Sequence, residues 1–261
     1  MIENRLKREG SKKMKLTILG FWGGYPTKNS GTSSYLLEAD NFQLLIDVGS
    51  ASLIALENHA DLLKLDAVLL SHYHYDHIAD LGVLQFTRQL KRTKNDLERA
   101  PLLPIYGHQG DSENFNRLTM DLVSEGIAYQ EAETLYIGPF EIQFMKTLHP
   151  VECYAMRIVE TKTGKTLIYT ADSGYLPGFI PFSKDAEVLL ADTNFFNGME
   201  NHRVHMTASE VGKIAKEAGI KKLILTHLPQ EGDLELLKAQ AINETPETEV
   251  ILAEKDLIIE I

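Results

Sequence analysis

The sequence predicts an α/β fold, because segments with the pattern of strands alternate with segments with the pattern of helices along most of the chain. The chain has 261 residues, of which 44% are hydrophobic, which is enough to bury a substantial core. Histidine and aspartate residues directly follow several of the predicted strands, where α/β proteins commonly place their sites. These residues are spread from His72 to His227 and would have to converge, so one domain is favoured over two.

The predicted elements follow one another in order. Strand-like segments at 15–20, 34–38 and 42–46 precede the first helical pattern. Further strands are expected at 66–70, 140–148, 166–170, 222–226 and 256–261. Helices are expected near 50–64, 78–92, 111–124, 207–218 and 232–243. We find no long linker rich in Pro, Gly or Ser and no short-period repeat, in agreement with one continuous domain.

The most specific feature is the heptapeptide Ser-His-Tyr-His-Tyr-Asp-His, which begins at Ser71 and follows an apolar run with the pattern of a buried strand. Alternate residues of an extended chain point the same way, so His72 and His74 would face one metal ion together. The following turn can bring Asp76 and His77 toward a second ion, and two-metal sites suit hydrolysis of phosphoryl or acyl bonds. A histidine-rich surface loop is the alternative, which the position at a strand end disfavours.

Three further candidate ligands close predicted strands later in the chain. They are His149, Asp172 and His227. Each alone is a weak signal. Together with the first cluster they make seven donors, enough to hold two ions and to leave positions for water.

Six short motifs occur in a fixed order from Met14 onward. They are MKLTILG at 14–20, IDVG at 46–49, the heptapeptide at 71–77, LHP at 148–150, TADS at 170–173 and THLP at 226–229. This series resembles the metallo-β-lactamase superfamily, and within it the branch of ribonuclease Z and related phosphodiesterases. The resemblance implies an αββα sandwich, in which two facing mixed β-sheets carry helices on their outer faces, as one catalytic domain over 14–261.

The same resemblance implies a ligand arrangement and cofactors. His72, His74 and His149 would bind one metal ion, and a second set, Asp76, His77 and His227, would bind the other. Asp172 would bridge the two. Two Zn²⁺ ions per chain are expected, with Mn²⁺ as a replacement.

A second histidine segment, Val-His-Met-Thr-Ala-Ser-Glu at 204–210, leads into a helical pattern. In the ribonuclease Z branch a His-x-Thr element stands here, and its histidine is thought to protonate the leaving group; His205 matches it. Independently, an imidazole near the metals but not needed as a ligand is a natural general acid. Thr207 and Glu210 also fit a capping box, which gives the segment a structural role as well. His202 lacks the following Thr and is expected in solvent.

Four other residues receive structural interpretations or stay open. Asp47 could orient a ligand imidazole or could be a turn aspartate bonded to its own backbone, and the sequence favours neither. His59 is expected at the surface or in packing, and His108 in a loop. Cys153, the only cysteine, is expected to be a buried free thiol.

The formal net charge of −11 disfavours tight binding of long nucleic acid, whereas two metal ions still offer a local positive site. A small anionic substrate is therefore expected. One group of basic residues could line the rim of the site, although an exposed helix end is the favoured interpretation: Arg88, Lys91, Arg92, Lys94 and Arg99. Between Asp80 and Thr226 we find no basic, Gly-rich insertion like the arm with which ribonuclease Z grips transfer RNA.

Together these observations predict a zinc-dependent hydrolase, a phosphodiesterase in which a metal-bridging hydroxide attacks a small phosphodiester such as a cyclic nucleotide or a short RNA end. Asp76 would orient the nucleophile and His205 would protonate the departing oxygen. Alternatives are an acyl hydrolase acting on thioesters, lactones or β-lactams, or ribonuclease Z-type processing of transfer RNA 3′ ends. A non-enzymatic metal-bound binding protein is disfavoured, because structural zinc sites usually have four closed ligands and often use Cys.

The sequence also gives expectations about environment and assembly. No apolar stretch reaches the eighteen or so residues that span a bilayer, and the N-terminus lacks the apolar core of a signal peptide, so a cytoplasmic protein is expected. Residues 1–13 are expected to form a flexible basic extension. The resemblance to ribonuclease Z implies a homodimer.

Overall fold

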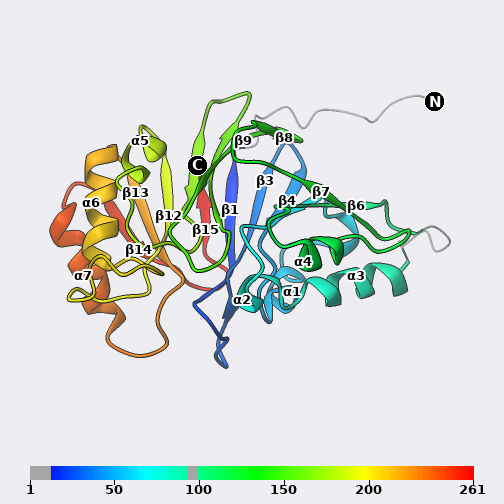
Figure 1. Cartoon of the computed structure of the whole chain (residues 1–261), viewed down its shortest axis with the longest axis horizontal. Coiled ribbons are helices and arrows are strands. Elements are labelled where there is room, and N and C mark those ends of the chain that lie inside the picture. Colours follow the sequence, from blue (N-terminus) through cyan, green and yellow to red (C-terminus); the bar gives the residue numbers. More distant parts are fainter. Residues whose placement is uncertain (1–12, 93–98) are drawn as a thin grey trace, which may run out of the picture.

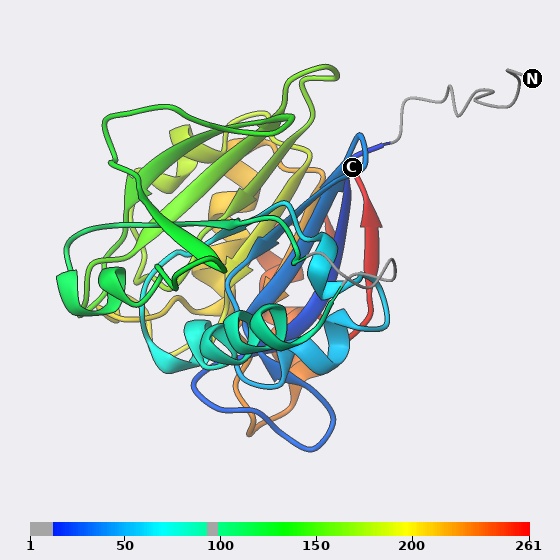
Figure 2. The same ribbon diagram turned by 90° about the vertical axis from the view of Figure 1, so that its right-hand side faces the viewer.

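Two mixed β-sheets face each other between layers of helices in the computed structural model, which describes residues 13–92 and 99–261. Figure 1 shows α6 and α7 on one side of the molecule and α1 and α3 on the opposite side, with the strands between them. Figure 2 shows the blue strands of the first sheet beside the green strands of the second. The predicted α/β sandwich is confirmed.

The first sheet has the strand order β15-β1-β3-β4-β5-β6-β7, with β2 paired to β1. Strands β1, β3 and β4 are antiparallel, and β4 to β7 are parallel. The bounds are β1 Lys15–Trp22, β2 Gly31–Thr32, β3 Ser34–Ala39, β4 Phe42–Ile46, β5 Ala67–Leu69, β6 Leu103–Gly107, β7 Ser124–Ala128 and β15 Ile258–Glu260.

The second sheet repeats this plan in the order β14-β13-β12-β11-β10-β9-β8. Strands β8 to β11 are antiparallel, and β11 to β14 are parallel. The bounds are β8 Leu135–Ile137, β9 Phe140–Lys146, β10 Tyr154–Glu160, β11 Thr166–Tyr169, β12 Val188–Asp192, β13 Lys222–Thr226 and β14 Glu249–Leu252. All five residues of β12 are buried, as expected for a parallel strand covered on both faces.

Alternating side chains of the first sheet pack into two different hydrophobic clusters, since successive residues of a strand point to opposite faces. One set shares a cluster with the second sheet; it includes Leu37, Leu44 and Leu69 with Phe144 and Met156. The residues next to them pack against the outer helices; they include Leu36, Leu45 and Val68 with Leu53 and Leu84. This alternation places one core between the sheets and another under α1 and α3.

The helices differ in length from several of the expected ones. Their bounds are α1 Ser52–Leu56, η1 Leu62–Lys64, α2 Tyr75–Ile78, α3 Leu81–Leu90, α4 Ser112–Asn116, α5 Phe179–Ser183, α6 Ala208–Ala218 and α7 Leu234–Glu244. The expected capping box is confirmed, because the Thr207 side chain accepts from the Glu210 backbone N–H and the Glu210 side chain accepts from the Thr207 N–H. Gly219, with φ of 71°, ends α6 in the left-handed conformation that glycine adopts most easily.

Two helix predictions were too long. The expected helix at 50–64 is broken between α1 and η1, where the Asp61 side chain accepts from the Leu63 N–H and starts a new turn. The expected helix at 111–124 ends after Asn116, because Leu118 and Val123 bury their side chains through a turn that leads into β7. Hydrophobic spacing alone did not distinguish these turns from a continuing helix.

The prediction that Arg88 belongs to an exposed basic group is wrong. Its guanidinium is buried and donates to the Leu62 and Pro101 carbonyls, at 2.5 and 2.7 Å, which ties α3 to neighbouring loops. Lys91 pairs with Glu57 on the surface at 2.9 Å. Arg92 and Arg99 are exposed, and Lys94 lies outside the described residues.

Two further expectations concern membrane-spanning helices and the N-terminal extension. Within 13–92 and 99–261, no helix is long and apolar enough to cross a membrane. The expected flexible extension at 1–13 lies, except for Lys13, outside the described residues. Lys13 pairs with Glu260 at the surface, at 2.8 Å.

Candidate metal centre

The candidate ligands lie beyond the carboxyl ends of strands from both sheets. His72, His149 and Asp172 follow β5, β9 and β11 by three residues each, and His227 directly follows β13. Strands that run in the same direction end at the same edge of a sheet, so these side chains converge there. The structure thereby brings together all seven residues that the sequence singled out, in two groups that share Asp172.

The first group contains His72, His74, His149 and Asp172. The Nδ1 atom of His74 lies 3.1 Å from the Nε2 atom of His72 and 3.0 Å from the Nε2 atom of His149. The Oδ2 atom of Asp172 lies 3.7 and 3.9 Å from the Nε2 atoms of His72 and His149. Three imidazole nitrogens and one carboxylate oxygen around a common point suit Zn²⁺.

The second group contains Asp76, His77, Asp172 and His227. The Nε2 atom of His227 lies 3.1 Å from Asp76 Oδ2 and 3.3 Å from Asp172 Oδ2. The Nε2 atom of His77 lies 3.2 Å from Asp172 Oδ1. The two oxygens of Asp172 thus face different imidazoles, as a bridging carboxylate would.

Unsatisfied buried atoms in the described part of the chain support a metal at this place. The Nε2 atom of His77 and the Oδ1 atom of Asp172 are buried without a hydrogen-bond partner there. Leaving buried polar atoms unpaired costs free energy, so such atoms at a functional site call for an explanation. A cation coordinated by both atoms would satisfy them, and the donor set therefore fits the expected metal ions.

Asp47 orients two of the imidazoles, which decides the choice that the sequence left open. Its carboxylate accepts from His77 Nδ1, the Ser71 hydroxyl and the Tyr169 hydroxyl, all at 2.8 Å. The Ser71 hydroxyl lies 3.0 Å from His72 Nδ1 and can accept its proton. These contacts place a proton on Nδ1 of both imidazoles, so Nε2 is the nitrogen that each can offer to a metal ion.

We expect Asp47→Asn to weaken metal binding about tenfold to a hundredfold, because such partners of ligand imidazoles have effects of this size. The loss should be greater at the group of His77, which Asp47 contacts directly. Competition with a chromophoric chelator would measure it. Unchanged metal affinity in a folded variant would show that Asp47 serves the turn alone.

The two groups differ in their proton affinity. Burial lowers the pKa values of His72, His74 and His149, so these imidazoles are neutral and ready to bind a metal. Burial also lowers the pKa of His227, but the carboxylates of Asp172 and Asp192 outweigh it and raise that pKa to about 10. In the metal-free protein His227 therefore carries a proton at neutral pH.

This difference predicts distinct pH dependences of metal binding. The pKa of His77 is likewise raised, because the carboxylates of Asp172, Asp76 and Asp47 outweigh its burial. At the second group a metal ion must therefore displace protons from both His227 and His77, so we expect its apparent affinity to rise more than about tenfold per pH unit from pH 6 to 8. The first group should show a shallower dependence. Metal titrations at several pH values, with the released protons counted in weak buffer, would test this. Equal slopes at both groups would contradict it.

The pKa of His227 also gives a sign for the stability of the metal-free protein. A histidine whose pKa is raised on folding stabilises the fold fully below its unfolded value of about 6.5. That contribution is lost as the pH rises toward about 10. It disappears when a metal ion replaces the proton.

His205 lies beside both groups, and its partner Asp192 was missed in the sequence. The Nδ1 atom of His205 donates to Asp192 Oδ2 at 2.8 Å, and its ring lies 4.9 Å from that of His227. Asp192 Oδ1 lies 3.4 Å from His227 Nδ1. Asp192 ends the apolar strand β12 just as other site residues follow theirs, and that signal could have identified it.

Asp192 and His205 also form a third potential metal group with Asp172 and His227. Within this group the His205 Nδ1 and Asp192 Oδ2 atoms lie 2.8 Å apart, at hydrogen-bond distance. Burial lowers the pKa of His205, but the neighbouring Asp192 carboxylate outweighs this and raises it. The geometry thus favours a proton-carrying imidazole over a ligand.

The other residues that the sequence considered lie in structural roles. Cys153 is a buried free thiol, as expected. His59 pairs with Asp256 at 2.6 Å near the surface. His108 follows β6 but is buried against Tyr73. His202 is half-buried with its ring 4.7 Å from that of Phe195, so the prediction that it lies in solvent was wrong.

Three residues at or next to the centre have strained backbone conformations. Asp47, Ala171 and His227 have φ values of 53°, 50° and 53°, which only glycine adopts without cost. Strained residues of this kind cluster at functional sites, where the surrounding packing holds them. Gly23 has another constraint, because a Cβ atom there would lie 2.8 Å from the imidazole of His227.

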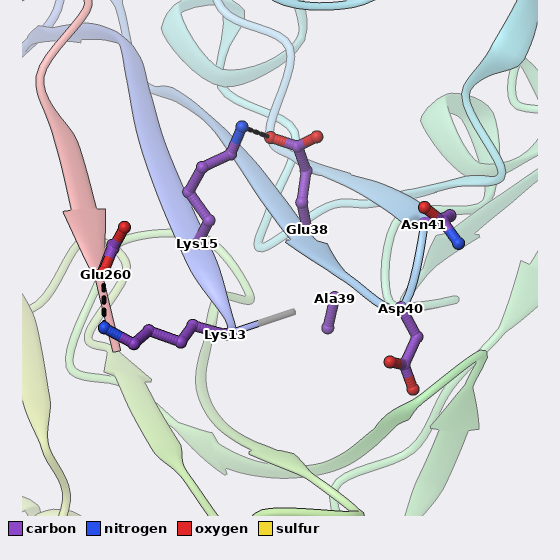
Figure 3. Close-up of a pocket in the computed structure, with 7 residues that line it drawn as sticks. All are labelled: Lys13, Lys15, Glu38, Ala39, Asp40, Asn41 and Glu260. Atoms are coloured by element: carbon purple, nitrogen blue, oxygen red, sulfur yellow. Dashed lines mark hydrogen bonds and ion pairs between the residues drawn. The ribbon is translucent and has the colours of Figure 1, made fainter. Parts of the chain in front are cut away.

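A pocket at the beginning of β1 is separate from this centre (Figure 3). Four of its charged side chains pair with one another, Lys13 with Glu260 and Lys15 with Glu38. It contains none of the candidate ligands. The pocket is therefore a surface feature and not part of the centre.

The comparisons of the sequence and of the structure with known proteins find the same relative. Residues 44–228 match the β-lactamase superfamily domain. The chain is 49% identical over 229 residues to the probable metallo-hydrolase YhfI of Bacillus subtilis. This alignment covers 87% of this chain and 92% of that protein. The crystal structure of YhfI aligns with a TM-score of 0.89 at 44% identity, over 95% of this chain and 100% of the other.

Two more distant structures share the fold. The short form of human tRNase Z aligns with a TM-score of 0.74 at 20% identity, over 95% of this chain and 99% of the other. A diphosphatase from the PhnP family aligns with a TM-score of 0.72 at 19% identity, over 95% and 98%. From the domain match and the close relative, this protein belongs to the β-lactamase superfamily and is a metal-dependent hydrolase of the metallo-β-lactamase fold.

Proposed function

We propose that this protein is a phosphodiesterase that uses two metal ions to hydrolyse a small phosphodiester such as a cyclic nucleotide or a short RNA end. Both ions would be Zn²⁺, with Mn²⁺ as a replacement. The proposal rests on one observation above all, the His205 imidazole held by Asp192 at 2.8 Å beside the two ligand groups. A phosphodiester has a poor alkoxide leaving group, which a positioned general acid assists.

One ion would be held by His72, His74 and His149. The other ion would be held by Asp76, His77 and His227. Asp172 would bind both ions. When bound, the ions lower the pKa of water and neutralise charge that develops on the phosphoryl group. Asp76 is itself fixed, since its Oδ2 atom accepts from the Gly24 N–H at 2.8 Å. We assign it the orientation of the nucleophile.

His205 would act as the general acid. Its Nδ1 proton is donated to Asp192, so the other ring nitrogen, Nε2, is the one that can give a proton to the departing oxygen. The raised pKa of His205 keeps that proton in place near neutral pH. Asp192 thereby has two tasks, because it fixes the ring and stabilises the imidazolium.

The charge distribution supports a small substrate over long nucleic acid. The chain has a net charge of −11, and Arg88 of the predicted basic group is buried. Binding of long nucleic acid depends mainly on basic side chains that contact phosphates.

The homodimer that the resemblance to ribonuclease Z implies stays a prediction.

The test measures hydrolysis of bis(p-nitrophenyl) phosphate by protein whose metal content has been determined. A thioester, a β-lactam and a transfer RNA precursor are assayed in parallel. About two metals per chain and turnover of the phosphodiester, without turnover of the acyl substrates, would support it. Cleavage of an acyl substrate alone would replace it with the acyl hydrolase alternative. Preferential cleavage of the precursor would indicate processing of transfer RNA.

A further inference from the structure

A cavity of about 570 Å³ opens beside the first ligand group, on the His74 side. Two of its walls continue from candidate ligands, because Tyr73 precedes His74, and Glu152 follows His149 after two residues. Its volume lies in the range of about 300–1,000 Å³ that is typical of small-molecule sites. The cavity is therefore large enough to receive the organic group of a phosphodiester bound at the centre.

The charges that line the cavity are negative. They come from Asp111, Glu113 and Glu152. Burial lowers the pKa of the lining His108, so this imidazole is neutral and contributes no positive charge at neutral pH. The amine of Lys146, which is outside the lining of the cavity, lies 4.0 Å from the Oε2 atom of Glu152. A second phosphate group would be repelled here.

Two of the three carboxylates are occupied by structural contacts. Asp111 caps α4 by accepting from the backbone N–H of Asn114 at 3.0 Å. Glu113 is largely exposed and pairs with Arg117 at 2.5 Å. These contacts leave Glu152 as the carboxylate that is best placed to bind a ligand.

Glu152 is held in place without being fully paired. Its Oε1 atom accepts from the Tyr154 hydroxyl at 2.9 Å and lies 3.6 Å from His108 Nδ1. Gly110 permits this position, because a Cβ atom at residue 110 would collide with the Glu152 carboxylate. An oriented carboxylate in a partly enclosed cavity accepts strong hydrogen bonds from N–H donors.

We propose that this cavity binds the nucleobase of a nucleotide phosphodiester and that Glu152 selects bases that carry an exocyclic amino group. The inference rests on the proposed phosphodiesterase function and specifies its substrate class. The rings of Tyr73 and His108, with centroids 4.5 Å apart, provide an aromatic wall for a flat base. The amino group would donate to Glu152, and the uncharged base would avoid the repulsion that a phosphate meets.

The test compares three substrates of the metal-loaded enzyme. Adenosine 3′,5′-cyclic monophosphate carries the amino group, its purine riboside analogue lacks only that group, and bis(p-nitrophenyl) phosphate has no N–H donor. We expect the wild type to prefer the adenosine compound in kcat/KM by about tenfold, as for a hydrogen bond to a charged group. Glu152→Gln should reduce that preference, because an amide oxygen accepts a weaker hydrogen bond than a carboxylate does.

Two further variants separate recognition from charge and from folding. Glu113→Gln removes the same charge from the cavity but breaks only a surface pair, so the preference should remain. Gly110→Ala keeps the charge but displaces the carboxylate, so the preference should fall. Thermal unfolding of each variant shows that the fold is intact.

The outcomes distinguish this inference from the proposed function. Turnover of bis(p-nitrophenyl) phosphate with equal kcat/KM for the two cyclic nucleotides would overturn the base-binding role and leave the phosphodiesterase proposal standing. Equal effects of Glu113→Gln and Glu152→Gln on the preference would likewise overturn the base-binding role alone. No turnover of any phosphodiester by the metal-loaded wild type would overturn both.

Discussion

Replacing His205 with alanine is expected to lower kcat for a phosphodiester with an alkoxide leaving group, such as a cyclic nucleotide, about a thousandfold, the middle of the range for loss of a general acid. The metal content should stay at the wild-type value, because Nδ1 of His205 is bound to Asp192 and the seven other donors remain. Metal analysis and steady-state kinetics on the same preparation would measure both quantities. The matched control is His202→Ala, which removes a nearby imidazole that packs on Phe195 and should leave kcat unchanged.

A pH profile adds a reading that a purely structural histidine would not give. The protonated general acid is the active form, so activity should fall as the pH rises through the pKa of His205. The Asp192 carboxylate raises that pKa, and Asp192→Asn should therefore move the alkaline limb to lower pH. Loss of metal in His205→Ala, to the same extent as in a ligand variant, would instead make His205 a ligand.

Removing the Asp172 carboxylate is expected to have the largest effect of any single substitution. Its two oxygens lie 3.2–3.9 Å from imidazole nitrogens of both groups, so Asp172→Ala deprives each ion of a ligand. We expect metal content well below one ion per chain and a loss of kcat beyond about ten-thousandfold, since the ions supply the nucleophile. Elemental analysis after gel filtration, with kinetics, would measure both.

The metal-free form of Asp172→Ala should also be less stable near neutral pH. The carboxylate of Asp172 is buried, and beside His227 and His77 its pKa is held well below the usual range despite burial. Its loss removes one of the carboxylates that balance the buried imidazolium groups, while Asp47 and Asp76 remain beside them, and should lower the free energy of unfolding by about 1.5–3 kcal/mol. Asp121→Ala, at an exposed position, provides the control for the substitution itself. Retention of two metals by Asp172→Ala would contradict the bridging role.

The residues of the centre were predictable where their signal was local. His72, His74, Asp76 and His77 lie within one short segment at a strand end, so pattern and spacing revealed them together. Asp192 was missed because it belongs to none of the short motifs, and its position at the end of the apolar strand β12 was the one signal that it gave. Only its contact with His205, thirteen residues later, gives it meaning.

The elements of the fold show the same division. The helix α6 was predicted with nearly its true bounds, because its capping box and its apolar spacing agree. The helix expected at 111–124 was wrong after Asn116, since the apolar residues there serve a turn and a parallel strand. Hydrophobic spacing reports burial, and a short buried turn satisfies it as well as a helix does.

The amino-acid sequence by itself determined the candidate donors of the centre, the order along the chain of the strands that present them and the resemblance that arranges them in two groups. These properties depend on neighbouring residues and on the two-residue period of an extended chain. The tertiary structure decided that Asp47 orients His77, that Asp192 holds His205, and that Glu152 lines a cavity beside His74. Such contacts join residues far apart in the chain, and they exist only because packing of the two sheets across one core brings the strand ends together.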